Sequence, residues 1–288
     1  MTTASPVTVE TLLENSLRDI GIPPCPLILK HISIEVQKDD PDPHSISSMI
    51  AADVALAASL ISLANSPYFG IRGHVRSVRE ALMVLGLDIA SRAIACIILR
   101  QTFPQSQQLE RFWDASARIA RLSGWLAQRF TQHRLRPDEA YTFGLFRDCG
   151  IAILLARYPG YQGILRDANH EATRAFTAIE DASLPTNHAM VSSLLAQSWW
   201  LPDEACLAIR HHHDASVIEP ASASFPLSSC YQIAVAQFAE YLLQQHSRLS
   251  YTEEWDKLGP ACLRVLDIDE AAVEGILVEA IPVMQLSD

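Results

Sequence analysis

The sequence lacks closely spaced cysteines, and none of its cysteines forms a Cys-x-x-Cys pair. The six cysteines are Cys25, Cys96, Cys149, Cys206, Cys230 and Cys262. A zinc ribbon needs paired cysteine ligands, and a disulfide-rich scaffold needs a dense set of cysteines, so this spacing indicates neither. We therefore expect a reducing compartment and a cytoplasmic protein.

The sequence also lacks a surplus of positive charge. It has 22 Lys and Arg residues against 33 Asp and Glu residues, a formal net charge of -11 at pH 7. Such a surface disfavours nonspecific binding to nucleic acids and to anionic lipids. Residues 1–6 do not resemble the start of a secretory signal, and the longest largely apolar stretch, 54–64, is about half of what a bilayer requires. We expect neither a nucleic-acid partner nor a membrane partner.

Common nucleotide-binding and nucleophile motifs are missing as well. The chain contains no Gly-x-x-x-x-Gly-Lys phosphate loop, no Gly-x-Gly-x-x-Gly turn and no Gly-x-Ser-x-Gly elbow. Nucleotide binding or ester hydrolysis through these devices is therefore not supported.

Helical spacing of apolar residues is what the sequence does have. Hydrophobic residues make up 49% of the 288 residues, and no segment shows the sustained apolar and polar alternation of a half-exposed strand. This pattern predicts an all-α protein with a continuous core. Predicted helices cover 8–21, 27–38, 45–65, 78–85, 87–103, 112–129, 137–146, 150–158, 161–169, 172–182, 187–199, 202–212, 227–246, 251–265 and 270–285.

Local signals predict how some of these helices begin and end. Ser77 and Glu80 have the spacing of a capping box, and Gly86 closes the helix that Ser77 opens. Asn65 precedes Ser66-Pro67, which predicts a left-handed helix cap at Asn65. The polar segment 104–108 predicts a boundary between a helical subdomain of about residues 1–106 and a second subdomain from about 107.

The segment 143–150, Phe-Gly-Leu-Phe-Arg-Asp-Cys-Gly, carries the main chemical signal. It resembles a phosphohydrolase motif in which adjacent His and Asp side chains bind a divalent cation that activates water. Here Arg147 stands in the histidine position before Asp148. A guanidinium stays protonated and has no acceptor atom, so Arg147 cannot be a metal ligand.

Landmarks in the first half of the chain resemble the HDOD family, a group of bacterial regulatory proteins. The segment 21–26 is similar to the family's proline-containing entry, and Asn65-Ser66 and Leu85-Gly86 match its most distinctive features. The family's usual Asp-Pro is Asp53-Val54 here, which removes an expected kink from the helix 45–65.

Landmarks in the second half extend the resemblance. Segment 112–116 is similar to the family's Phe-Trp-x-His-Ser, with Ala115 where a histidine often stands. The remaining matches are Arg147-Asp148, His188, Trp199 or Trp200 with Leu201-Pro202, and His211-His212. The resemblance covers about residues 15–214, and residues 215–288 are expected to form a helical extension packed on the HD-like subdomain.

The resemblance implies a helical fold related to HD-type phosphohydrolases, with a degenerate metal site. By motif position, Ala115 and Arg147 replace two histidine ligands, while Asp148, His188, His211 or His212, and Glu240 remain. We expect no catalytic residues, no cofactor and no bound metal. Arg147 either pairs with Asp148 and Glu240, supplying the charge of a lost cation, or points to solvent from a helix end.

The histidines admit structural interpretations too. Consecutive residues on a helix point about 100 degrees apart, so at most one or two of the histidines 211–213 can face one ion. Histidines near a helix C-terminus also interact favourably with the helix dipole. For His188, at a helix start beside Asn187, we expect a satisfied polar role.

These observations favour a non-catalytic bacterial signal-transduction protein of the HDOD class that acts through protein partners. Two alternatives remain open. One is a residual metal-dependent phosphohydrolase or phosphodiesterase that uses Asp148 and the histidines. The other is a sensor that binds a nucleotide or another small molecule in the degenerate pocket.

Overall fold

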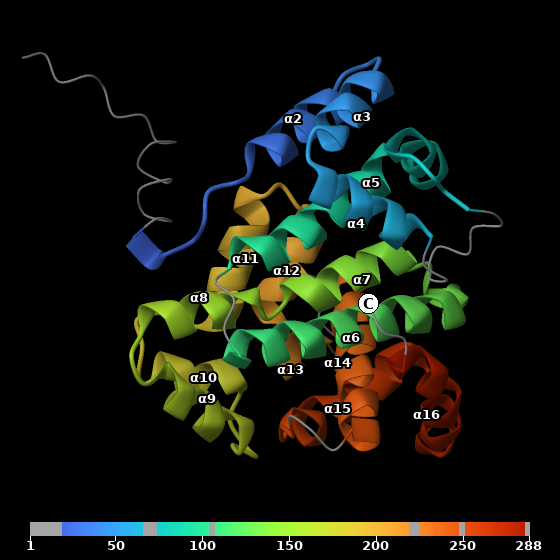
Figure 1. Ribbon diagram of the computed structural model, residues 1–288. Helices are drawn as coiled ribbons and strands as arrows, with labels where there is room; N and C mark the ends of the chain where they lie inside the picture. Colours follow the sequence, from blue (N-terminus) through green and yellow to red (C-terminus); the bar gives the residue numbers. More distant parts are fainter. Residues whose placement is uncertain (1–18, 66–73, 104–106, 219–224, 248–250, 286–288) are drawn as a thin grey trace, which may run out of the picture.

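The computed structural model describes residues 19–65, 74–103, 107–218, 225–247 and 251–285, and all regular structure in these ranges is helical (Figure 1). The predicted all-α fold is therefore confirmed. The helices are α2 (Leu27–Val36), α3 (Pro43–Ala51), α4 (Val54–Ala64), α5 (Val78–Thr102), α6 (Gln107–Arg129), α7 (Pro137–Phe146), α8 (Cys149–Arg157), α9 (Tyr161–Asn169), α10 (Phe176–Asp181), α11 (His188–Ser198), α12 (Asp203–His211), α13 (Ala215–Ile218), α14 (Leu227–Ser247), α15 (Glu254–Leu266) and α16 (Glu270–Met284), with the 3-10 helix η2 (Thr131–His133) between α6 and α7. The helix predicted from residue 8 and the family residue Ser66 lie outside the described residues.

The N-terminal helices form a group of their own around α5. Helices α2, α3 and α4 pack against α5, which also contacts α7. Figure 1 shows this group in blue and cyan above the two long green helices α6 and α7. The C-terminal helix α14 packs against α6, α7 and α12, so the helices after residue 215 lie on the part of the chain that carries the motif 143–150.

The chain turns sharply between α3 and α4. The sequence predicts one helix over 45–65, but the two helices observed there are bent by 117°. Asp53 explains the break, because its carboxylate accepts the Leu56 N–H at 3.0 Å and thereby starts α4 as its N-cap. The expectation that Asp53-Val54 removes a kink is wrong.

Helix α5 is broken at Gly86, as the sequence predicts. Gly86 has φ of 75° inside the span Val78–Thr102, a conformation that favours glycine. At its start, Ser77 accepts the Glu80 N–H at 3.2 Å, while the Glu80 carboxylate accepts the N–H of Arg76 at 2.7 Å. One half of the predicted capping box is thus present.

Length and composition alone would allow α5 to cross a bilayer, and the bent pair α3 and α4 would also pass if it formed one span. Buried residues such as Leu82, Ile94 and Leu99 belong to the hydrophobic core. We therefore interpret α5 as a core helix.

Asn65 joins the end of α4 to the chain that leads into α5. Its amide nitrogen donates to the carbonyls of Ile61 at 2.9 Å and Val75 at 2.8 Å, and its side-chain oxygen accepts the Val75 N–H at 2.8 Å. Its φ of -84° is right-handed, so the predicted left-handed cap is wrong. Asn65 is instead a cross-link between segments ten residues apart.

We predict that Asn65→Ala lowers the free energy of unfolding by about 2 to 3 kcal/mol, because it leaves backbone groups of the buried Val75 without partners. Urea unfolding followed by circular dichroism measures the change. The control is Gln37→Ala, at the equivalent backbone position of α2, where Gln37 is exposed. Equal effects of the two substitutions would contradict the cross-link.

Candidate functional site

The site is built where α7 ends and α8 begins. Arg147 follows the last residue of α7, and Asp148 precedes the first residue of α8. Helix α8 packs closely on α11, and the Gly150 N–H donates to the Ser192 hydroxyl at 2.7 Å. A Cβ at Gly150 would lie 2.3 Å from the carbonyl oxygen of His188. The motif glycine therefore allows the approach that brings Asp148 close to His188.

Arg147 is a buried cation between two carboxylates. Only 2% of its surface is exposed, and its Nε lies 3.0 Å from an Asp148 oxygen while its Nη2 lies 2.6 Å from Glu240 Oε2. Burial alone would lower the pKa of Arg147, but the two carboxylates hold it above its ordinary value. The alternative that Arg147 points to solvent is wrong.

Ala115 lies at the same place. Together with Arg147, Asp148 and Glu240, it lines one cavity of about 730 Å³. The structure therefore brings together these four of the residues that the motif resemblance assigns to the site. At this position the guanidinium of Arg147 is the positive group that contacts both acids.

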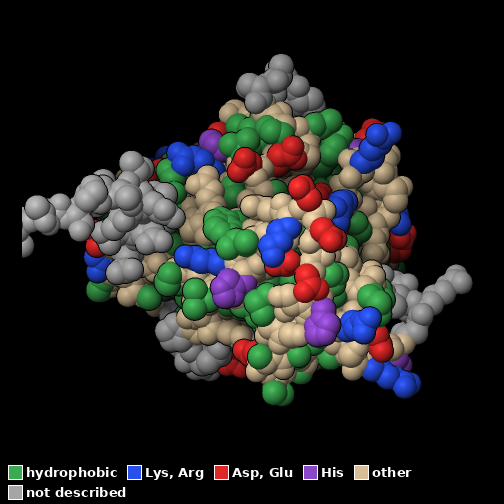
Figure 2. Space-filling view, turned by 90° about the horizontal axis from the view of Figure 1, so that it is seen from above, with side chains coloured by type: hydrophobic (Ala, Val, Ile, Leu, Met, Phe, Trp, Pro, Cys, Tyr) green, Lys and Arg blue, Asp and Glu red, His purple; other side chains and the backbone are tan. Residues whose placement is uncertain are grey.

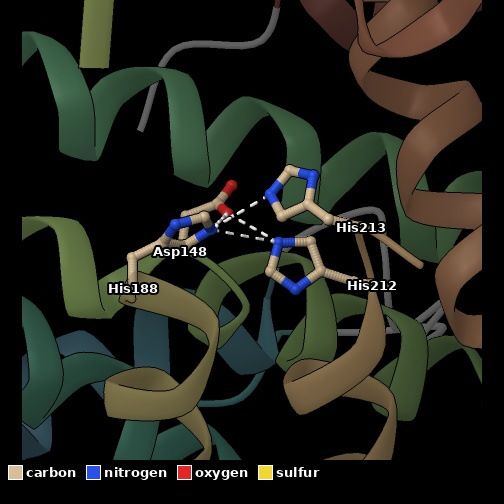
Figure 3. A group of neighbouring side chains, drawn as sticks. All are labelled: Asp148, His188, His212 and His213. Atoms are coloured by element: carbon tan, nitrogen blue, oxygen red, sulfur yellow. Dashed lines mark hydrogen bonds and ion pairs between the residues drawn. The ribbon is translucent and has the colours of Figure 1, made fainter. Parts of the chain in front are cut away.

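Three histidines, His188, His212 and His213, gather around Asp148 (Figure 3). The Nε2 atom of His188 lies 3.4 Å from Nε2 of His212 and 3.1 Å from Nε2 of His213. Asp148 Oδ1 lies 3.1 Å from His212 Nε2 and 3.5 Å from His188 Nε2. All three histidines are buried, and one ligand atom from each of the four residues lies within 4.8 Å of every other.

The Nδ1 atom of each imidazole, on the side away from the cluster, has an oxygen atom as its hydrogen-bond partner. The partner of His188 is Glu180 Oε2 at 2.7 Å, that of His212 is the Ile209 carbonyl at 2.6 Å, and that of His213 is Glu254 Oε2 at 2.6 Å. An Nδ1–H that donates to an oxygen leaves the lone pair on Nε2 free. When all three imidazoles are neutral and in this tautomer, their Nε2 lone pairs point toward one another, an arrangement that a cation stabilises.

This arrangement fits a single transition-metal ion. Two ligand atoms bound to a tetrahedral zinc ion lie about 3.3 to 3.4 Å apart, and four of the spacings in the cluster are between 3.1 and 3.5 Å. Imidazole nitrogens with one carboxylate suit Zn²⁺, Fe²⁺ and related ions. Oxygen partners on the far nitrogen are the usual support of histidine ligands.

The charges around the cluster favour a cation as well. Burial alone would lower the pKa of His188, but Glu180 and Asp148 raise it to about 10. His213 behaves differently, since burial and the neighbouring His212 lower its pKa to about 4. The surroundings of His188 therefore favour one positive charge near Asp148 and Glu180, which a proton on His188 or a bound metal ion can supply.

The structure corrects the predicted set of histidines. His211 lies outside the cluster, with its ring 5.8 Å from the ring of Phe225, whereas His213 belongs to it. Helix α12 ends at His211, so the regular turn of 100 degrees per residue does not apply to His213. Both His212 and His213 can then face His188, and the polar role expected of His188 is the contact with Glu180.

Sequence reasoning missed Glu180 and Glu254. Glu180 is fully buried in α10 and accepts hydrogen bonds from the Tyr161 hydroxyl and the His188 N–H. Glu254 is the first residue of α15. Neither residue has a local sequence signal, because each meets its histidine only through the packing of separate helices.

Comparison with known proteins identifies the family. The model of the HDOD domain matches residues 22–215, about two thirds of the chain. The chain belongs to the HDOD family. The match includes Ala115, Arg147, Asp148 and the histidine cluster, but it ends before Glu240 and Glu254.

Solved structures share the fold over nearly the whole chain. An HDOD domain protein of unknown function from Geobacter sulfurreducens has a TM-score of 0.64 at 23% identity and covers 96% of this chain and 97% of its own. A provisionally named phosphohydrolase from Shewanella amazonensis SB2B has a TM-score of 0.67 at 18% identity, covering 94% and 95%. At these identities the likeness shows the fold alone.

A curated relative is longer. An uncharacterised protein from Treponema pallidum is 26% identical over 197 residues, which are 67% of this chain and 38% of that protein. The chain therefore matches well under half the length of this relative.

We predict that Gly150→Ala destabilises the protein by about 2 kcal/mol, because the added Cβ forces α8 away from α11. Gly163→Ala in α9 is the matched control, since a Cβ there meets nothing within 4 Å, and it should be neutral or slightly stabilising. Thermal unfolding of both variants measures the difference. A Gly150→Ala protein as stable as wild type would contradict this close contact.

Proposed function

We propose that this chain is a regulatory HDOD protein that transmits a signal to a protein partner and does not hydrolyse phosphate esters. The observation that carries this proposal is the buried guanidinium of Arg147 between Asp148 and Glu240. HD-type hydrolysis needs a cation that lowers the pKa of a bound water and stabilises charge on the phosphoryl group. A guanidinium supplies positive charge but cannot bind and ionise a water molecule in this way.

Removing the Arg147 side chain would lower the free energy of unfolding. Breaking a buried ion pair leaves uncompensated charge, and here two carboxylates would lose their common partner. Arg147 therefore stabilises the fold around the former hydrolase site. A protein that uses this fold for signalling needs the stable shape and not the reaction.

We further propose that Asp148, His188, His212 and His213 hold one divalent transition-metal ion. This proposal departs from the sequence-based expectation of no metal, and it rests on the four converging ligand atoms and the three supported Nδ1 atoms. A bound ion with four protein ligands would have no open position for a water molecule, as in structural zinc sites, so it would supply positive charge at the centre of the cluster and not the hydrolytic reaction. The four ligands come from three places in the chain, so the ion would tie α8, α11 and the end of α12 together.

A protein partner is favoured by apolar side chains on the N-terminal helices. Leu27 of α2, Val54 of α4 and Met83 of α5 are 73%, 82% and 66% exposed. Figure 2 views the molecule from the side of these helices and shows hydrophobic side chains among mixed charges. A provisionally named signal transduction protein from Marinobacter aquaeolei VT8 has the same fold, with a TM-score of 0.62 at 21% identity over 94% of this chain and 59% of its own.

Binding of a small molecule is a second candidate function, favoured by the cavity in front of Arg147. Its volume of about 730 Å³ is within the range of ligand pockets. Phe112 and Phe176 line it together with Arg111 and Gln244. These residues would suit a ligand with an apolar ring and a polar or anionic group.

We predict that the wild-type chain, incubated with Mn²⁺, Zn²⁺ or Fe²⁺, hydrolyses bis-p-nitrophenyl phosphate and cyclic dinucleotides no faster than the Asp148→Ala variant. The physical reason is the guanidinium at the position of a catalytic ligand. Release of nitrophenol and chromatography of the nucleotides measure turnover.

Metal-dependent turnover that disappears in Asp148→Ala would contradict the regulatory assignment and favour a residual hydrolase. A nucleotide that raises the melting temperature without being hydrolysed would support the sensor instead, because binding to the native state stabilises it.

We predict that the chain, after dialysis against Zn²⁺ and desalting, retains about one metal ion per molecule, since four ligands form one site. His188→Ala and His212→Ala should lose most of this metal. His211→Ala is the matched control and should retain it, because His211 lies outside the cluster. Mass spectrometry of the elements gives the ratio, and a folded wild-type chain without stoichiometric metal would exclude the site.

A further inference from the structure

The histidine cluster is completed by a residue beyond the HDOD match. The family model ends at residue 215, yet the Nδ1 atom of His213 has Glu254 Oε2 as its partner at 2.6 Å. Glu254 is 2% exposed and begins α15. The support of one candidate ligand therefore depends on how the C-terminal helices pack.

The start of α15 is fixed to the chain around α9 and α10. The Glu253 N–H donates to the Asn169 carbonyl at 2.9 Å, and the Lys257 ammonium donates to the Arg174 carbonyl at 3.0 Å. Lys257 also pairs with Glu254. These contacts hold the Glu254 carboxylate beside His213, although the two residues are 41 positions apart in the sequence.

A stacking contact on the face of its ring also fixes His213. Its ring stacks on Phe176 of α10, with 4.8 Å between the centroids and 16° between the planes. The ring can therefore neither tilt away from His188 nor turn over without losing both the stack and the bond to Glu254. Its Nε2 atom stays directed at the cluster.

The carboxylate has a chemical effect besides an orienting one. An Nδ1–H that donates to a carboxylate keeps the lone pair on Nε2 and makes this nitrogen a better donor to a metal. Glu180 acts in the same way on His188, but it lies inside the family match.

We propose that Glu254 is a positioning residue through which the C-terminal helix α15 sets the metal affinity of the cluster. This inference rests on the metal centre proposed above. Because coupling between two equilibria is reciprocal, a bound metal ion also strengthens the packing of α15 on the HDOD domain. Packing of α15 then raises the occupancy of the metal site, and occupancy of the metal site stabilises the packing of α15.

The test is a titration of the 288-residue chain with Co²⁺, followed by the visible absorption of the bound ion. Glu254→Ala should weaken binding by about 10- to 100-fold and change the spectrum, as expected when the support of a histidine ligand is lost. Glu254→Gln should have a smaller effect, since its amide oxygen still accepts from Nδ1–H but carries no charge. Glu274→Ala, on the exposed side of α16, is the control and should match wild type.

The two failures are distinguishable. A folded wild-type chain that binds no Co²⁺ would overturn the metal centre and the role of Glu254 together. Wild-type binding with unchanged affinity and spectrum in both Glu254 variants would overturn the positioning role alone. If Glu254→Ala does not fold, because Lys257 loses its partner, Glu254→Gln carries the test.

Reciprocity gives an independent measurement. Hydrogen exchange of the amides in 254–266 should slow when Co²⁺ is added to wild type and change less in Glu254→Gln. Equal slowing in the two proteins would overturn the coupling.

Discussion

The structure around the site depends on one constraint: the largely buried carboxylates of Asp148 and Glu240 need a positive charge beside them. Asp148 and Glu240 lie where α7, α8 and α14 meet, and two carboxylates cannot stay ionised there without a cation nearby. Arg147 supplies one cation covalently, from the residue next to Asp148. Because the guanidinium contacts both acids, it supplies the positive charge that they need at this point.

The same need extends to the histidine side of Asp148. Glu180 and Glu254 are buried behind His188 and His213, so two further carboxylates face the cluster from α10 and α15. Glu180 and Asp148 raise the pKa of His188 above its ordinary value, so they favour positive charge at this point. A single bound cation would satisfy these groups together, with the neutral imidazoles as its ligands. One half of the site thus has an internal cation, and we propose that the other half holds a bound one.

The site also shows where the functional unit ends. The family match stops at residue 215, but Glu240 of α14 contacts Arg147 and Glu254 of α15 contacts His213, both of which lie inside the match. The C-terminal helices are therefore part of the site and not an appendage to it. Since they reach Arg147 and His213 from outside the family domain, they offer a route by which other parts of a signalling system could affect the centre.

The sequence by itself determined the helical class, the break at Gly86 and the family. Those features depend on local spacing and on the chemistry of single side chains. Only the tertiary structure decided that Arg147 is buried, that His213 and not His211 joins His188, and that Glu180 and Glu254 support the cluster. The direction of His213 depends on where α12 ends, and the two glutamates meet their histidines through the packing of helices distant in sequence. Such contacts leave no periodic or motif signal, because only the folded chain brings their members together.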